Sequence, residues 1–211
     1  MESWAPGGEG AIRGAMVRGM VAGLDRVFID PTVAPVGQKN PGAITYGIAP
    51  HASTGRTATA IEADLAALVQ AMINGGSTLR FCVWVLHPRS ALFLSQLRIS
   101  GVRTFPDLEA GGGRLLGFEA LVSASAPLVG SPGVTTITLI DVERIMIADD
   151  KVATVDVSQQ ASLQTRDDPA SGATTQTSLF QANLVAIKIL RVVSWQRVAD
   201  TSVQLLSDVS Y

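Results

Sequence analysis

Apolar residues near the N-terminus recur with the period of a helix. Residues 9–29 carry them at intervals of three and four, which predicts a helix with a single apolar stripe. The stripe contains Ile12, Met16, Met20, Leu24 and Val27. Gly14, Gly19 and Gly23 also fall inside this helix, and each costs about 1 kcal/mol relative to alanine. The helix therefore either approaches a neighbouring element or subunit closely or is marginally stable by itself.

A turn-rich stretch follows this helix. Asp30-Pro31 ends the helix, because the residue before a proline is disfavoured in the α region. Residues 28–47, "FIDPTVAPVGQKNPGAITYG", hold three prolines and three glycines but neither histidine nor cysteine and only one carboxylate. The stretch predicts a firmly fixed chain path that carries no reactive group.

The middle of the chain predicts two more helices and two strands. The segment "TLRFCVWVL" is apolar almost throughout, as expected of a buried strand, and His87-Pro88-Arg89 then turns the chain into a helix. The helices cover 59–73 and 90–98, the strands cover 78–86 and 118–125, and a glycine-rich loop covers 109–117.

From residue 134 onward, apolar and polar residues alternate with a period of two. The segments "VTTITLID", "RIMIAD" and "KVATVDVSQQASLQ" predict half-buried strands. The polar run 165–177 predicts a loop with hairpin character. The long run 178–195, rich in Val and Ile, predicts either one bent strand or a helix that passes into a strand. Together these elements predict an α+β fold, and 211 residues suffice for one large domain or two small ones that share a core.

Charge is scarce along the chain. Charged residues make up 16% of it and apolar residues 47%, whereas average globular domains contain about 25% charged residues. Either other chains cover much of the surface or a large core produces the same bias, and we favour the first interpretation. The net charge of −2 provides no basic field for nucleic acid or for an anionic membrane.

No segment predicts export or membrane insertion. The apolar runs are far shorter than the ~20 residues that cross a bilayer, and "MESWAPGGEG" lacks the basic flank and apolar core of a secretion signal. Cys82 is the single cysteine and is expected to pack as a small buried hydrophobe. These features predict a soluble protein of a reducing cytoplasm without a membrane partner.

Candidate catalytic and metal-binding residues are few. His51 and His87 lie in different segments without metal-ligand spacing, and the nucleophile motif Gly-x-Ser-x-Gly does not occur. The pairs Asp149-Asp150 and Asp167-Asp168 could in principle bind Mg²⁺ or serve as an acid/base pair. Adjacent acids in turn-like stretches are more often solvated, which is the interpretation we favour.

Two further motifs predict structure instead of chemistry. The run "AGGGRLLG" misses the G-x-G-x-x-G spacing and precedes a strand, whereas a phosphate-binding loop opens a helix. Trp84 is expected in the core, and Trp195 beside Arg191 and Arg197 provides no stacking platform for single strands. We predict no catalytic residues, no cofactor-binding residues and no metal site.

The segments follow one another in a distinctive order. The long helix precedes "DPTVAPVGQKNPGAITYG", and a strand with a Pro-Arg turn follows in "WVLHPRSALFLSQLR". Next come "FPDLEAGGGRLLGFEALVSASAP", "TLIDVERIMIADDKVATVDVSQQASL" and finally "LVAIKILRVVSW". This order, over most of residues 9–200, resembles the tailed-phage major capsid proteins of the HK97 fold.

The resemblance implies a peripheral (P) domain and an axial (A) domain. It assigns 1–47 to the P-domain spine helix and the crossing into the A domain, 48–140 to the A domain, 141–200 to P-domain strands and a loop, and 201–211 to a C-terminal tail. In the family an N-terminal arm and an extended hairpin, the E-loop, precede the spine helix, and we expect this chain to lack both. The family's lysine–asparagine cross-link is not expected either, since "VAIKIL" holds no acid where the catalytic carboxylate would lie.

The resemblance also implies how such a chain works. A capsid subunit acts by self-assembly, so the expected partners are copies of itself in pentamers, hexamers and three-fold contacts, and head proteins such as the portal or scaffold. Sequence-specific nucleic acid binding is not expected. The location would be the virion, after production in the bacterial host cytoplasm.

Two alternatives stay open at this point. The same fold could serve an encapsulin-like bacterial shell that encloses an enzyme. A small α/β enzyme is the other, using His87, Arg89 and the acids Asp149-Asp150, and it requires these groups to converge in one pocket.

Overall fold

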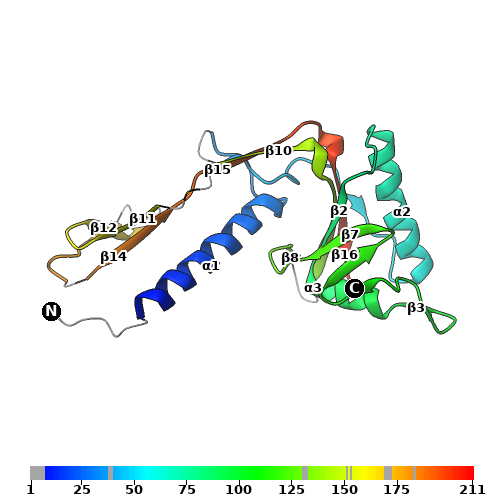
Figure 1. Ribbon diagram of the computed structural model, residues 1–211, viewed down its shortest axis with the longest axis horizontal. Coiled ribbons are helices and arrows are strands. Elements are labelled where there is room, and N and C mark those ends of the chain that lie inside the picture. The colour runs from blue at the N-terminus through cyan, green and yellow to red at the C-terminus, as the bar shows by residue number, and fades with distance from the viewer. Residues whose placement is uncertain are drawn as a thin grey trace. The chain divides into compact units, whose positions relative to one another are not determined.

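A computed structural model describes residues 8–37, 40–129, 133–150, 152, 154–168, 173–182 and 184–211 (Figure 1). These residues separate into two compact units. Unit 1 contains the residues up to Val17 together with Asp149–Val193, and unit 2 contains Arg18–Ala148 and Ser194–Tyr211. Helix α1, Gly8–Ile29, begins in unit 1 and ends in unit 2, as the apolar stripe predicted for residues 9–29.

Unit 2 is built on one mixed sheet. Among the described residues it has eight strands in the order β1-β16-β9-β2-β7-β6-β5, with β8 paired to β9. The strands are β1 His51–Ala52, β2 Cys82–Leu86, β5 Leu108–Glu109, β6 Gly112–Leu115, β7 Phe118–Val122, β8 Leu128–Val129, β9 Val134–Asp141 and β16 Val203–Val209. Two further pairs are β3 Arg98–Ile99 with β4 Val102–Arg103, and β10 Ile145–Asp149 with β15 Val193–Arg197. Short 3₁₀ turns occupy Val142–Arg144 and Asp200–Ser202.

Strand β2 lies at the centre of the sheet. It runs antiparallel to β9, where Trp84 pairs with Leu139, and parallel to β7, where Trp84 pairs with Ala120. A strand flanked on both sides and covered on both faces reads as a continuous apolar run, which explains "CVWVL". The predicted strand 78–86 is confirmed from Cys82 onward. It starts later than expected because Leu79 has a φ of 58°, which is incompatible with a strand.

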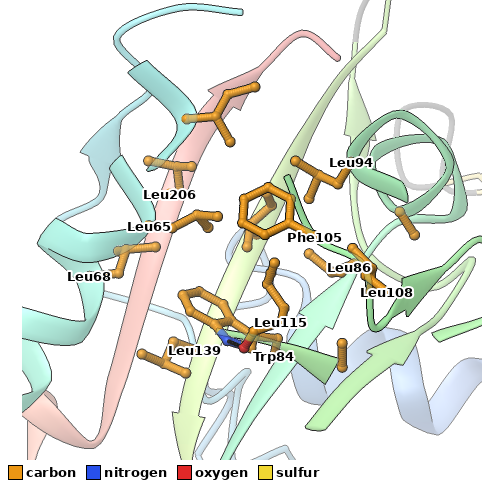
Figure 2. Close-up of a cluster of buried hydrophobic side chains, with 14 of the residues drawn as sticks. Leu65, Leu68, Trp84, Leu86, Leu94, Phe105, Leu108, Leu115, Leu139 and Leu206 are labelled. Carbon is orange, nitrogen blue, oxygen red and sulfur yellow. Dashed lines mark hydrogen bonds between the residues drawn. The ribbon is translucent and has the colours of Figure 1, made fainter. Parts of the chain in front are cut away.

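Two helices cover this sheet and enclose the core. Helix α2, Ala58–Asn74, packs against β16 and β9, and helix α3, Pro88–Gln96, packs against β5. Figure 2 shows leucines from both helices converging on Trp84 and Phe105, and all of the labelled side chains there are buried. The Trp84 indole N–H donates a hydrogen bond to the Leu115 carbonyl at 2.9 Å, so the polar atom of this buried side chain is satisfied.

The glycine-rich run 109–117 is a strand pair instead of the predicted loop. Strand β6 pairs with β5 on one side and with β7 on the other. Gly112 and Gly113 have φ values of 124° and 136°, a region that other residues rarely adopt. A Cβ at Gly113 would lie 2.3 Å from the Asp107 carbonyl oxygen. These glycines therefore allow close backbone approach inside the sheet, as glycines within strands commonly do.

Residues 201–211, expected to be a C-terminal tail, form part of the sheet instead. They contain β16, which lies between β1 and β9 inside the sheet. Val203, Leu206 and Val209 are fully buried. The segment is short, and the neighbours that bury it come from residues 51–52 and 134–141, so its own sequence gave no sign of a central position.

Besides the first part of α1, unit 1 contains two-stranded pairs among its described residues. Its strands are β11 Thr154–Ser158 with β14 Ala186–Leu190, and β12 Ser162–Asp168 with β13 Ala173–Ser178. Most of the polar run 165–177 thus lies in two antiparallel strands paired with each other, and residues 169–172 lie outside the described residues. The run 178–195 holds β14 and the start of β15, separated by two residues, so it is two strands and not one bent strand or a helix.

The glycine geometry generates a stability prediction. Gly113→Ala is expected to lower the free energy of unfolding by about 1–3 kcal/mol, because the new Cβ overlaps backbone and φ is positive. Gly111→Ala, where a Cβ would meet nothing within 4 Å, is the matched control and should stay within about 0.5 kcal/mol. Urea unfolding followed by tryptophan fluorescence measures both. Equal midpoints for the two variants would contradict the strand geometry.

Candidate functional site

The residues of the enzyme alternative each have a local structural role. His87 is the N-cap of α3, and its Nδ1 accepts the Arg89 backbone N–H at 3.2 Å. Burial, aided by the Arg89 charge, lowers the pKa of His87, so the imidazole is neutral at pH 7. The Arg89 guanidinium donates to the Gly133 carbonyl at 3.0 Å. Both side chains thus support the turn into α3.

The acidic pairs lie in or beside strands. Asp149 ends β10 and forms a two-point ion pair with Arg191, whose Nε lies 3.1 Å from Oδ1. Asp167 and Asp168 belong to β12 of the hairpin. Nowhere in the described residues do three His, Cys, Asp or Glu side chains gather closely enough to hold a metal ion.

His51 and Cys82, the other residues considered for chemistry, also have structural positions. His51 begins the edge strand β1, where its carbonyl accepts the Ser207 hydroxyl. Cys82 is 4% exposed in β2, and burial raises the pKa of its thiol, which confirms the expectation of a buried hydrophobe. Within the described part of the chain, no helix has the length and apolar character to cross a bilayer.

The turn-rich stretch 28–47 is anchored by Trp195. The Trp195 indole N–H donates to the Gly42 carbonyl at 2.7 Å, and its ring meets Phe28 edge-on with centroids 5.2 Å apart. The ring is nearly buried, at 8% exposed. One side chain from β15 therefore holds both the start of this stretch and a point 14 residues further along it. The sequence around Trp195 does not predict this role, because the residues that the side chain contacts lie more than 150 positions away.

Arg197 extends this anchor by two residues along β15. Its guanidinium donates to the carbonyls of Ile44 and Tyr46 and pairs with Asp200 at 2.9 Å. The Thr45 hydroxyl donates to the Ile29 carbonyl at 2.8 Å, which joins the stretch back to the end of α1. The chain path predicted to be rigid is therefore held by side-chain and backbone hydrogen bonds along its length.

Asp30 organises the exit from helix α1. It is 7% exposed, and its Oδ1 accepts the Thr32 hydroxyl at 2.7 Å and the Thr32 backbone N–H at 3.0 Å. Burial alone would raise the pKa of Asp30, but the Thr32 hydrogen bonds and Arg26 outweigh it and hold that pKa below its usual value.

Unit 1 exposes apolar side chains that it does not cover. Among the described residues of Asp149–Val193, Leu179 is the one buried apolar side chain. Phe180 is 76% exposed. The other large apolar residues exposed in this segment are Val152, Val157, Leu163, Leu184, Val185, Leu190 and Val192. A two-stranded pair is marginally stable in water without a covered face, so these ribbons need a further surface to pack on.

Helix α1 presents a second uncovered surface. Its stripe residues are half-buried, as predicted, whereas Val17 and Val21 are exposed. A Cβ at Gly19 or Gly23 would meet nothing within 4 Å. Contacts within the described part of the chain therefore do not explain these two glycines, and the remaining expectation is close approach by a neighbouring subunit.

Comparison with known proteins finds a similar sequence in a phage protein. No protein-family model matches the sequence. A capsid polyprotein of Pseudomonas phage PAJU2 is 31% identical over 211 residues, covering 98% of this chain and 31% of the relative. The chain thus spans about a third of the length of this curated relative.

Solved structures match over nearly the whole chain. One from Mycobacterium phage Ogopogo has a TM-score of 0.66 at 15% identity, covering 96% of this chain and 68% of that one. The capsid of an empty GTA particle has a TM-score of 0.63 at 14% identity, covering 99% and 68%. The holo-SrpI encapsulin complex from Synechococcus elongatus PCC 7942 has a TM-score of 0.58 at 10% identity, covering 99% and 68%.

The Trp195 anchor generates a second prediction. Trp195→Phe keeps an aromatic ring but removes the N–H donor, leaving the Gly42 carbonyl without it, and should lower the free energy of unfolding by about 1–3 kcal/mol. Gln196→Ala, a neighbouring exposed position, is the control and should change it by less than about 0.5 kcal/mol. Proteolysis within 28–47 should accelerate in Trp195→Phe alone. Equal cleavage of both variants would refute the anchor.

The Asp30 geometry predicts a pH dependence. Because its folded-state pKa lies below the usual value of about 3.9, Asp30 stabilises the fold above that pH and loses this contribution as pH falls through the folded-state pKa. Asp30→Asn should therefore be less stable than the native chain at pH 7, and the difference should shrink below about pH 4. Urea titrations at several pH values measure it, with the exposed Asp25→Asn as control. A pH-independent difference would count against the assignment.

Proposed function

We propose that this chain, which has the HK97-type capsid fold, forms part of a structural subunit of a tailed-phage head and acts by self-assembly. The likeness to the phage Ogopogo structure and to the GTA capsid confirms the α+β HK97-type fold expected from the sequence. The match to a phage capsid polyprotein confirms the resemblance and supports the structural role.

The uncovered ribbons of unit 1 are the observation that carries this proposal. A segment of 45 residues with one buried apolar side chain among those described cannot gain enough from burial to fix its own conformation. Neighbouring copies can supply the missing surface, since oligomers commonly bury apolar faces that the isolated chain exposes. The low charge content of the chain agrees with such coverage.

The domain roles are part of the proposal. We take 1–47 as the spine helix and crossing, 48–140 as the A domain and 141–200 as P-domain strands and loop. The compactness of Asp149–Val193 supports a separate P-domain portion, and the burial of β16 supports grouping 201–211 with the strands of 48–140. The fixed stretch 28–47 would then hold the crossing in one shape in every copy.

The partners and location follow from the same role. Copies of this chain would meet in pentamers, hexamers and three-fold contacts, and head proteins such as a portal or scaffold would join them in the virion after synthesis in the host cytoplasm. No catalytic step is assigned to the chain. The structural settings of His87, Arg89 and Asp149 support this choice.

An encapsulin-like shell is the second candidate. The likeness to the SrpI encapsulin favours it at the level of the fold, whereas the sequence match is to a phage protein. A cargo enzyme encoded beside this chain would favour the shell, and neighbouring portal, protease and terminase genes would favour the phage head.

The test is the mass of the purified chain by light scattering, with negative-stain images of any large species. Rings or shells are expected, and a monomer at all accessible concentrations would overturn the proposal.

Gly19→Leu should reduce assembly because a bulky side chain blocks close approach along α1, while Gly19→Ala should assemble normally. Both variants should fold as well as the native chain, since Gly19 faces open space and glycine is a poor helix former. Normal assembly of Gly19→Leu would show that this helix face is not an interface.

A further inference from the structure

A small hairpin of unit 2 carries two cations and two apolar side chains, all exposed. Strands β3 and β4 pair Arg98 with Arg103 and Ile99 with Val102. Ser100 and Gly101 join them with φ values of 50° and 84°, as a tight two-residue turn requires. Val102 is 71% exposed, and in Figure 1 the hairpin, labelled at β3, extends from the edge of unit 2. The short turn gives this projecting group a defined shape.

The charges on this hairpin lack a counterpart in their own chain. Arg98 and Arg103 are direct cross-strand neighbours, and like charges in that position destabilise a strand pair. Arg98 donates to the Gly101 carbonyl, and no carboxylate of the described residues forms an ion pair with either arginine. The hairpin would therefore gain from an acidic surface supplied from outside.

A hollow of about 420 Å³, whose lining includes the residues that directly follow the hairpin, has the complementary character. Helix α2 contributes Glu62 and Ala66, the segment after β4 contributes Phe105 and Asp107, and the β6–β7 turn closes it. Its charged lining consists of two carboxylates, Glu62 and Asp107, and one guanidinium, Arg114. The lining thus combines an apolar floor with a negative balance.

The hydroxyl group of Thr104, which lines this hollow, has no hydrogen-bond partner among the described residues. Its oxygen atom is buried. Buried polar atoms nearly always have a partner, so an orphan in a hollow points to a group that enters it. The hairpin of the same copy does not fill this space, because Ile99 and Val102 are both exposed.

We propose that the β3–β4 hairpin of one copy docks into this hollow of the next copy. Val102 then packs beside Ala66 and Phe105, and Arg98 and Arg103 face Glu62 and Asp107, with one guanidinium within reach of the Thr104 hydroxyl. The contact is head-to-tail, because hairpin and hollow are different surfaces of the same chain, and such contacts generate rings when the rotation closes. Pairing of two hairpins is disfavoured, since it would bring four guanidinium groups together.

This inference rests on the proposed self-assembly and specifies one contact within it. A six-residue hairpin buries much less than the roughly 800 Å² per partner of a stable interface. Its role is therefore to select the neighbour and fix the register, while the larger apolar surfaces supply most of the affinity.

Charge exchange tests the contact. Arg98→Glu with Arg103→Glu should reduce the assembled fraction at least tenfold, and so should Glu62→Arg with Asp107→Arg. Combining all four substitutions in one chain should restore assembly, because each hairpin again meets a hollow of opposite charge. Arg56→Glu with Arg80→Glu alters exposed arginines outside the hairpin, the hollow and helix α1 by the same charge and should assemble normally. Failure of the fourfold variant to recover, with circular dichroism unchanged, would overturn the contact.

Disulfide trapping gives an independent answer. A mixture of Val102→Cys and Ala66→Cys chains should form a disulfide-linked dimer that contains one of each, and Cys82 should not interfere because it is buried. Dimers of Val102→Cys alone would indicate hairpin pairing and overturn the proposal. Assembly of the native chain without the mixed dimer would overturn this contact and leave the proposed function standing. A native chain that neither assembles nor cross-links would overturn both.

Discussion

Burial of strand β2 is the interaction on which unit 2 depends. Trp84 lies fully buried between β9 and β7 and donates its N–H to Leu115, so it joins the central strands to β6. Helices α2 and α3 complete the core around it (Figure 2). Because close-packed interiors resist deformation, the loops and hairpins of this unit project from a rigid base. A subunit that must present the same contacts in many copies requires such a base.

The stretch 28–47 is held in one conformation without nucleophilic or metal-binding side chains. Its prolines and turns restrict the backbone, and Trp195 and Arg197 bind its carbonyls from β15. No nucleophile or metal ligand is needed for this role, which agrees with the sparse reactive groups in the segment. Side chains that looked like enzyme candidates, such as His87 and Arg89, support local turns in the same manner.

The two units differ in how many apolar side chains each buries within its own chain. Unit 2 holds nearly all of the buried apolar residues described, whereas unit 1 presents ribbons with exposed valines, leucines and Phe180. Such a division suits a protein whose final structure is an assembly: one part folds on its own, and another part is completed by neighbours. The hairpin and hollow of unit 2 add charge complementarity, which favours one neighbour arrangement over others.

The sequence by itself determined the local elements and the fold family. Helical spacing placed α1, the apolar run placed β2, alternation placed β9 and β10, and segment order led to the HK97-type fold. These features depend on residues close together in the chain, where periodicity and turn chemistry act. Only the tertiary structure decided that 203–209 is a central strand, that Gly112 and Gly113 lie within a sheet, and that Trp195 anchors Gly42. The first and the last depend on contacts between distant segments, and pairing partners of that kind leave no periodic signal in either segment alone. The pairing of Gly112 and Gly113 is local, but a run of glycines is typical of a loop and carries no alternation that would predict a strand.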